Sequence, residues 1–272
     1  MNYALMKNDL SGKWAVVTGA DGGIGIEFCR VLARRGCSLV MVSVTVDPLR
    51  HAALSLENEF GIKALPFTLD LTDPHAESML AAFLGANDLD PDFVINNAGI
   101  FSFRQLADTA DEKIRCFIDL HVRATTMLSL YFARRFKQRG SGRILNMSSM
   151  SCWMPMPGLA MYSSTKAYIR VFTRALHYEL KDYGSSATVA APGGIATSLF
   201  GLPDNLMKIA VGIGAVAKPD RFAEKAIKAM LKGKKQYING LVNRLAIFFI
   251  GITPTWLRMQ VKRRLLDKGI VK

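Results

Sequence analysis

The sequence predicts a single α/β domain built on a doubly wound parallel sheet. Three observations predict it. Short apolar runs alternate with helical stretches, and the connections are too long for hairpins. A glycine-rich turn directly follows the first apolar run. The 272 residues are 50% hydrophobic, which is enough for one sheet covered on both faces and marginal for two domains.

The predicted strands are short apolar runs, as expected of strands buried on both faces. They are 13–18, 38–44, 63–69, 93–95, 143–147 and 188–191. The predicted helices are 24–35, 47–60, 74–84, 112–139 and 162–183. Gly36 and Gly61 follow the first two helices, where glycine is a natural helix terminator. We expect one domain over residues 1–240 and a C-terminal extension over 241–272 that is not an independent domain.

The glycine-rich turn at residues 18–25 (TGADGGIG) lies where the pyrophosphate of a dinucleotide would bind. Gly19 permits the tight turn, Gly23 lets backbone approach the phosphates, and Gly25 lets the helix pack on the strand. The unpaired N–H groups and positive dipole end of that helix favour an anion. The alternative is an ordinary glycine-rich turn, which its position after the first strand disfavours.

The second predicted strand lacks both features that distinguish NAD from NADP. An acid there would bind the ribose 2′-OH and an Arg would accept a 2′-phosphate, but this chain has Ser43 and Val44. Asp21, in the turn, would repel a 2′-phosphate if it points that way, or else it is a solvated loop residue. We expect NAD or NADP as cofactor, with NAD favoured.

Tyr162 and Lys166 are one helical turn apart, so a phenol and an ammonium share one helix face. The ordinary pKa of tyrosine, about 10, is too high for acid–base catalysis at neutral pH. We expect Lys166 and an oxidised nicotinamide to lower it. Ser149 follows the fifth predicted strand, at the sheet edge where substrates bind, and its hydroxyl can hydrogen-bond a carbonyl oxygen. The alternative is a surface tyrosine beside a solvated lysine.

With these motifs in this order, residues 10–232 resemble the short-chain dehydrogenase/reductase family, in its compact type with a TGxxxGIG turn. Asp70 in LDLT matches the adenine-contacting acid, residues 96–99 (NNAG) match the segment after the fourth strand, and residues 192–197 (PGGIAT) resemble the PGxxxT segment. The resemblance implies a Rossmann-like fold and this set of cofactor-binding residues: Gly19, Asp21, Gly22, Gly23, Ile24, Gly25, Ser43, Asp70, Leu71, Asn97, Ala98, Gly99, Tyr162, Lys166, Pro192, Gly193, Ile195 and Thr197.

The resemblance also implies hydride transfer between the nicotinamide and a carbonyl or secondary alcohol. Tyr162 would be the general acid in reduction and the base in oxidation, and Ser149 would position the substrate oxygen. Lys166 would lower the pKa of Tyr162 and hold the nicotinamide ribose hydroxyls. The backbone of Ile195 and the hydroxyl of Thr197 would hold the carboxamide. The family further implies a homodimer or homotetramer.

One position departs from the family pattern. The family usually has Asn in the helix after the NNAG segment, where it helps to organise a proton-relay water, and this chain has His121. We expect His121 either to fill the kink passively or to join the relay as a catalytic residue. Hydride transfer is unaffected by this choice, whereas the route that reprotonates Tyr162 depends on it.

The segment expected to cover the substrate, residues 197–217, is rich in Leu, Ile, Val, Met and Gly. Mobile apolar loops suit lipophilic ligands. Met150, Trp153, Met154 and Met156 could line the same cleft, because methionine adapts its shape to its surroundings. We expect a lipophilic substrate, such as a steroid or a long acyl chain. The alternative is that these side chains only pack the core or the lid.

The net charge of +13 is concentrated near the C-terminus. Residues 218–272 contain 14 Lys and Arg against 3 Asp and Glu, and the residues before them contain 21 against 19. One local basic patch argues against a nucleic-acid-binding surface. Residues 245–252 (LAIFFIGI) are too few to span a bilayer, and 256–266 reads as a basic amphipathic helix. This extension would contact either an anionic membrane or a partner subunit.

The remaining features concern compartment and competing functions. The four cysteines lack CxxC spacing and paired His ligands, and the N-terminus lacks signal-peptide features, so we expect a cytoplasmic protein with free thiols and no metal. Peripheral membrane association is one of the two alternatives for the C-terminal extension.

A non-catalytic dinucleotide sensor or scaffold is the alternative function. A sugar-nucleotide epimerase also uses YxxxK but usually has different glycine spacing.

Overall fold

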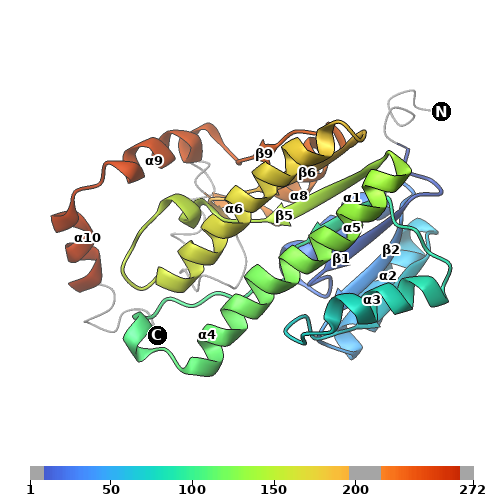
Figure 1. The fold of residues 1–272 in the computed structure, drawn as a ribbon, viewed down its shortest axis with the longest axis horizontal. Coiled ribbons are helices and arrows are strands. Elements are labelled where there is room, and N and C mark those ends of the chain that lie inside the picture. The colour runs from blue at the N-terminus through green and yellow to red at the C-terminus, as the bar shows by residue number, and fades with distance from the viewer. Residues whose placement is uncertain (1–8, 196–215, 264–272) are drawn as a thin grey trace.

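The computed structural model describes residues 9–195 and 216–263. Its main sheet is seven-stranded and all-parallel, in the order β3-β2-β1-β4-β5-β6-β9 (Figure 1). The strands are β1 (Trp14–Thr18), β2 (Ser38–Ser43), β3 (Ala64–Thr68), β4 (Phe93–Asn96), β5 (Gly142–Met147), β6 (Ser185–Ala190) and β9 (Gln236–Tyr237). The short strands β7 (Gly194–Ile195) and β8 (Val216–Ala217) form a separate pair. The predicted doubly wound α/β fold is confirmed.

Helices cover both faces of the sheet, because successive strand residues point to opposite sides. Ala15 and Val17 pack in one core with α1 (Gly23–Ala33), α2 (Asp47–Phe60) and α8 (Pro219–Leu231). Val16 packs in the other core with α3 (Ala76–Ala86), α5 (Thr125–Arg139) and α6 (Ala160–Lys181). The near-continuous apolar character of the strands follows from this double burial.

The long helix predicted over 112–139 is interrupted. It consists of α4 (Asp111–Phe117), the π-helical turn η3 (Ile118–Ala124) and α5. Two 3₁₀ turns, η2 (Leu106–Asp108) and η4 (Met150–Trp153), belong to the loops after β4 and β5. The last two helices of the described structure are α9 (Leu241–Gly251) and α10 (Thr255–Val261), which extend to one side of the sheet (Figure 1). Among the described residues, no helix has the length and apolar character needed to cross a membrane.

The elements that the sequence prediction missed include β9, α8 and α9, and the prediction shortened β6. β6 begins at Ser185 because the buried serines at its start pair with β5, although serine gives no strand signal. β9 has two residues, too few for a periodic pattern. α8 did leave a signal, namely Pro219 in its first turn and buried apolar residues three or four positions apart. α9 is apolar along most of its length and so lacks a clear amphipathic period.

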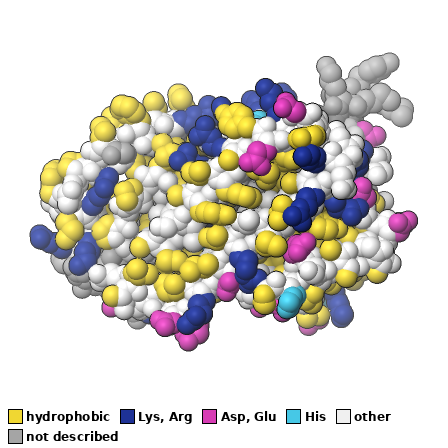
Figure 2. All heavy atoms as spheres, viewed as in Figure 1, with side chains coloured by type: hydrophobic (Ala, Val, Ile, Leu, Met, Phe, Trp, Pro, Cys, Tyr) yellow, Lys and Arg dark blue, Asp and Glu magenta, His cyan; other side chains and the backbone are white. Residues whose placement is uncertain are grey.

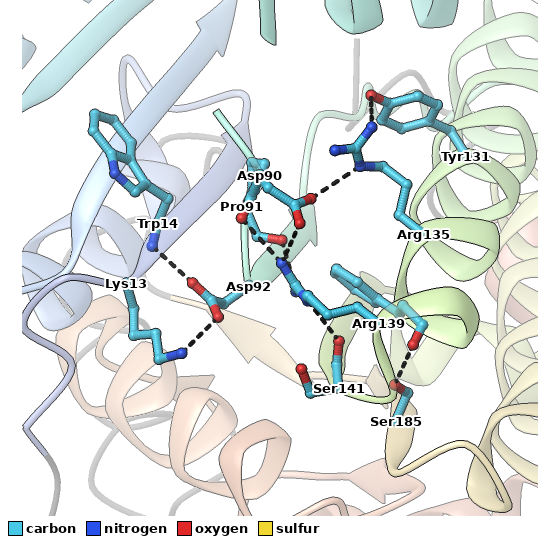
Figure 3. Close-up of polar contacts among 11 residues, drawn as sticks. Lys13, Trp14, Asp90, Pro91, Asp92, Tyr131, Arg135, Arg139, Ser141 and Ser185 are labelled. Atoms are coloured by element: carbon cyan, nitrogen blue, oxygen red, sulfur yellow. Dashed lines mark hydrogen bonds and ion pairs between the residues drawn. The ribbon is translucent and has the colours of Figure 1, made fainter. Parts of the chain in front are cut away.

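Salt bridges fix the edge of the sheet opposite the glycine-rich turn (Figure 3). Asp92 accepts hydrogen bonds from the Lys13 ammonium at 2.9 Å and from the Trp14 N–H at 3.2 Å, which ties β4 to β1. Asp90 pairs with Arg135 and Arg139 of α5, both at 2.9 Å. Such half-exposed pairs are each weak, so their role is to set where β4 enters the sheet rather than to supply much stability.

The glycine-rich turn is closed tightly at two glycines. Gly19 has a φ of +62°, in the left-handed region that favours glycine. A Cβ on Gly25 would overlap the carbonyl oxygen of Gly19, so α1 can start this close to β1 only with glycine there. The roles predicted for Gly19 and Gly25 agree with this geometry. By contrast, a Cβ on Gly22 would meet no atom within 4 Å.

We expect Gly25→Ala to lower the free energy of unfolding by about 3 kcal/mol, because backbone must move to admit the methyl group. Urea unfolding measures the change. Gly22→Ala is the matched control and should stay within about 0.5 kcal/mol of the parent, since its φ of −173° suits any residue. Equal effects of the two substitutions would contradict the close contact inferred at Gly25.

Candidate active site

A cavity of about 290 Å³ opens at the carboxyl edge of the sheet, beside the point between β1 and β4 where the strand order reverses. A second cavity of about 400 Å³ adjoins it and shares five of its lining residues: Gly19, Asp21, Ala98, Gly99 and Ile100. The first also contains the predicted catalytic residues Ser149, Tyr162 and Lys166, and the second contains Ser43, Asp70 and Leu71. The structure therefore brings the two sets of predicted residues to one continuous edge.

Asn97 and Thr18 hold the wall between β1 and β4. The Asn97 side-chain amide donates to the carbonyl oxygens of Thr18 at 3.0 Å and Gly19 at 3.2 Å. In return, the Thr18 hydroxyl accepts the N–H groups of Asn97 at 2.9 Å and Ala98 at 3.0 Å. These four bonds fix the shape of the glycine-rich turn from the neighbouring strand.

Tyr162 and Lys166 lie on the buried face of α6, as their spacing predicts. The Lys166 ammonium is 5.8 Å from the centre of the Tyr162 ring and donates to the carbonyl oxygen of Met147 at 3.0 Å. Ser149 caps the 3₁₀ turn after β5, where its hydroxyl accepts the N–H of Ser151 at 3.1 Å. Phe101 contacts the Tyr162 ring edge-on at 5.0 Å between centres, which limits where the phenol can move.

The electrostatics of the phenol differ from the sequence prediction. Burial raises the pKa of Tyr162 above its ordinary value, while a hydrogen bond from Ser149 lowers it. The sequence predicts that Lys166 lowers the pKa of Tyr162, but burial has the largest effect on that pKa and raises it. Burial lowers the pKa of Lys166 to about 8, because enclosure disfavours the charged ammonium. The raised pKa keeps Tyr162 protonated at neutral pH.

His121 lies in the π-helical turn η3 and is fully buried. Its Nε2 accepts the N–H of Ile100 at 3.0 Å, so Nδ1 carries the proton and faces the Thr165 hydroxyl at 2.9 Å. Burial, and to a lesser degree the nearby Lys166, lower the pKa of His121 to about 2. Both ring nitrogens are engaged and the ring stays neutral, which favours the structural role over the relay role.

The second cavity is acidic. Asp21 Oδ2 accepts a hydrogen bond from the Thr45 hydroxyl at 2.8 Å, so the turn reaches across to the end of β2. Asp70 is held by the backbone and hydroxyl of Thr72, at 2.8 and 2.7 Å. Among the described residues that line this cavity, two are Asp and none is Lys or Arg.

The two cavities fit a dinucleotide in three respects. The cradle at Gly19 and Gly22–Ile24 is open to the first cavity, next to the start of α1. Gly99 leaves no room for a side chain, since a Cβ would lie 2.9 Å from the His121 Nε2 atom. The remaining predicted cofactor residues Pro192 and Gly193 line the first cavity, and Ile195 follows in β7. Thr197 and most of the expected covering segment lie outside the described residues.

The structure places part of the segment after Ser149. Met150, Trp153, Met154 and Met156 are not among the described residues that line the first cavity. The 3₁₀ turn capped by Ser149 carries the chain back against α6, where the Arg170 guanidinium covers the Trp153 ring at 4.8 Å. Trp153 therefore packs on α6, and a role of the three methionines in the cleft stays a prediction.

Sequence reasoning missed several partners of the site. Thr18 was seen only as part of the glycine motif, although its hydroxyl binds two N–H groups of the next strand's loop. Thr45 and Thr165 hold Asp21 and His121. Ile100 fixes the tautomer of His121 through its backbone, and a backbone contact leaves no signal in the sequence.

Comparison with known proteins identifies the family. Residues 13–202 match the family model described as short chain dehydrogenase. Since this match covers most of the chain, the protein belongs to the short-chain dehydrogenase/reductase family. The resemblance drawn from the motifs is confirmed.

Individual relatives add detail. A very-long-chain 3-oxoacyl-CoA reductase of Danio rerio is 32% identical over 206 residues, which are 73% of this chain and 64% of that protein. This chain thus spans less than two thirds of that relative. An inactive hydroxysteroid dehydrogenase-like protein of Homo sapiens is 28% identical over 251 residues, which are 90% of this chain and 74% of that protein. The structure of L-sorbose reductase from Gluconobacter frateurii, complexed with NADPH and L-sorbose, is 26% identical with a TM-score of 0.77, over 86% of this chain and 97% of that one.

The burial of neutral His121 predicts a pH dependence of stability. Unfolded His binds a proton below about pH 6.5, whereas folded His121 does not until about pH 2. The unfolded state therefore binds more protons as pH falls, and His121 should cost about 2 kcal/mol of stability between pH 8 and pH 5. His121→Asn should remove this part of the acid sensitivity, as measured by urea unfolding at both pH values.

The surface histidine His51 on α2 supplies the control, because His51→Asn should leave the difference between the two pH values unchanged. Equal acid sensitivity in His121→Asn and the parent would contradict the buried neutral state. A relay role predicts instead that the substitution alters the pH profile of turnover.

Proposed function

We propose that this protein is a nicotinamide-dependent reductase that interconverts a carbonyl group and a secondary alcohol on a lipophilic acyl substrate. The observation that carries the proposal is the meeting of Ser149, Tyr162 and Lys166 in one cavity with the glycine-rich turn. Each of these side chains alone is common, but together at the switch point of a parallel sheet they form an acid–base site beside a dinucleotide cradle.

The chemistry divides between cofactor and protein. The nicotinamide, when bound, supplies or accepts the hydride. Tyr162 would donate its phenolic proton to the carbonyl oxygen during reduction, and its raised pKa keeps that proton in place until then. Ser149 donates a hydrogen bond to the same oxygen as negative charge develops there. Lys166, whose pKa is about 8, would hold the ribose hydroxyls of the cofactor and add positive charge close to the phenol.

The substrate class rests on the relatives and on the site. The Danio rerio relative is a very-long-chain 3-oxoacyl-CoA reductase, and the cavity that contains Tyr162 has apolar lining residues such as Ile100 and Met147, with the Phe101 ring against Tyr162. A 3-oxoacyl thioester presents a ketone at a fixed distance from a polar head group and a long apolar chain beyond it. We therefore propose a long-chain 3-oxoacyl thioester as the substrate, ahead of a steroid.

A non-catalytic dinucleotide-binding protein is the second candidate, and the similarity to the inactive human relative favours it. The complete set of Ser149, Tyr162 and Lys166 supports the enzyme instead. A sensor would need the cofactor cradle but not a buried phenol, hydroxyl and ammonium at the same cavity.

We expect Tyr162→Phe to reduce turnover of a long-chain 3-oxoacyl thioester about a thousandfold, because the general acid is lost. The dissociation constant of the cofactor, measured by fluorescence titration, should change little. Tyr168→Phe is the matched control on the exposed side of α6 and should keep full activity. Absence of activity in the parent with cofactor bound would favour the sensor, and turnover of L-sorbose alone would contradict the lipophilic substrate.

We further propose that the cofactor is NAD rather than NADP. The second cavity carries the carboxylates of Asp21 and Asp70 and, in its described lining, no cation to neutralise a 2′-phosphate. The Thr45 hydroxyl orients Asp21 toward the end of β2, where a ribose would lie. The Gluconobacter frateurii relative binds NADPH, so this preference would distinguish the present chain from it.

The cofactor preference can be reversed by charge. We expect the parent to bind NADH at least about tenfold more tightly than NADPH, and Val44→Arg with Asp21→Asn to gain about tenfold for NADPH. Val44 is 64% exposed at the end of β2, so it tolerates arginine. Val171→Arg on α6 adds the same charge away from the cavity and should not change the ratio. Tighter binding of NADPH by the parent would contradict the proposal.

A further inference from the structure

The C-terminal arm, residues 241–263, carries α9 and α10 and gathers most of the strongly exposed apolar side chains of the described structure. Leu241 is 71% exposed, Phe248 69% and Ile252 66%. The full set of exposed large apolar residues on the arm is Leu241, Val242, Leu245, Phe248, Phe249, Ile252, Trp256, Leu257 and Met259. A contiguous surface of this kind marks a binding site rather than ordinary surface.

The charge of the arm restricts what can cover it. No Asp or Glu occurs between residues 239 and 263, whereas Arg244, Arg258, Lys262 and Arg263 are all basic. In Figure 2, yellow and dark-blue side chains occupy the end of the molecule where Figure 1 places the arm. An occupant must therefore be both apolar and anionic. A second copy of this chain, docked face to face, would bring these like charges together.

The geometry of the arm suits the surface of a bilayer. α9 has 11 residues and α10 has 7, with Pro254 between them, so neither can cross the roughly 30 Å of a hydrocarbon core. Arg258 of α10 donates to the carbonyl oxygen of Ile250 at 3.4 Å, which joins the two helices. Aromatic residues such as Phe248, Phe249 and Trp256 are favoured at the interface between lipid head groups and acyl chains.

The base of the arm contacts the wall of the active-site cavity. The Gly193 N–H, in that wall, donates to Asn239 Oδ1 at 2.8 Å, and Asn243 of α9 donates to the carbonyl oxygen of Asn239 at 3.0 Å. α9 also packs on the 3₁₀ turn that begins after Ser149. A surface bound by the arm would therefore lie beside the residues that handle substrate.

We propose that the C-terminal arm docks this protein on an anionic membrane surface, with α9 and α10 lying in the head-group region. The exposed apolar side chains enter the lipid, and the basic residues contact anionic head groups. Docking itself does not rest on the proposed function. If that function also holds, docking places the cavity beside the phase in which a lipophilic acyl substrate dissolves.

The test measures partition of the full-length protein onto sedimenting vesicles of phosphatidylcholine, with and without phosphatidylserine. We expect strong binding only when phosphatidylserine is present. Phe248→Ser with Phe249→Ser should weaken partition more than about tenfold, because two aromatic rings no longer enter the lipid. Lys262→Gln with Arg263→Gln should weaken it about twentyfold, since each basic residue contributes about a factor of five.

Two matched controls show whether partition onto the vesicles depends on the arm itself. Leu54→Ser with Val171→Ser removes apolar side chains that are 55% and 59% exposed on α2 and α6, and should not affect partition. Lys225→Gln with Lys228→Gln removes the same charge from α8 and should have little effect.

Three results would overturn the proposal. The parent could remain in the supernatant with both kinds of vesicle. Partition could depend on phosphatidylserine but not on Phe248 and Phe249, which would indicate only general attraction of a basic protein. The Phe variant could convert an oligomer to a monomer, seen by light scattering, without changing partition, which would make the arm a subunit interface. None of these measurements depends on turnover, so failure here is distinct from failure of the proposed reaction.

Discussion

The hydrogen bonds of Asn97 with the glycine-rich turn are the constraint on which the site depends. They join the ends of β1 and β4, the two strands between which the sheet changes direction. A parallel sheet opens a crevice at this point because the connections leave toward opposite faces. The close approach of Gly25 to Gly19 then brings the start of α1 to that crevice. The glycine-rich turn and the cavity that contains Ser149, Tyr162 and Lys166 share one wall as a result.

Burial governs the chemistry of the residues around this wall. Tyr162 and Lys166 of α6 and His121 of η3 are all buried near the same edge of the sheet. Burial disfavours the charged form of each, so the pKa of Tyr162 rises while the pKa values of Lys166 and His121 fall. The buried groups are therefore a protonated phenol, an ammonium with a pKa of about 8 and a neutral imidazole.

The molecule presents two contrasting surfaces. The edge away from the glycine-rich turn is held by partly exposed salt bridges of Asp90 and Asp92, and it carries both signs of charge. The C-terminal arm carries apolar side chains with basic residues only. Asn239, at the base of the arm, accepts a hydrogen bond from the Gly193 N–H in the cavity wall. The surface of the arm therefore begins close to the cavity.

The sequence by itself determined the fold class, the glycine-rich turn and the pairing of Tyr162 with Lys166. Each of these is local: alternation along the chain, spacing within a turn and one helical turn on α6 leave a direct pattern in the residues. The position of Ser149 after β5 followed from the same alternation.

Only the tertiary structure decided what depends on contacts between distant segments. The tautomer of His121 is set by Ile100 and Thr165, and the orientation of Asp21 by Thr45, none of which a spacing rule connects. The packing of Trp153 against the Arg170 guanidinium is likewise a contact between segments distant in the sequence. The pKa of Tyr162 rose rather than fell because desolvation depends on everything packed around the phenol, and a sequence records only its neighbours along the chain.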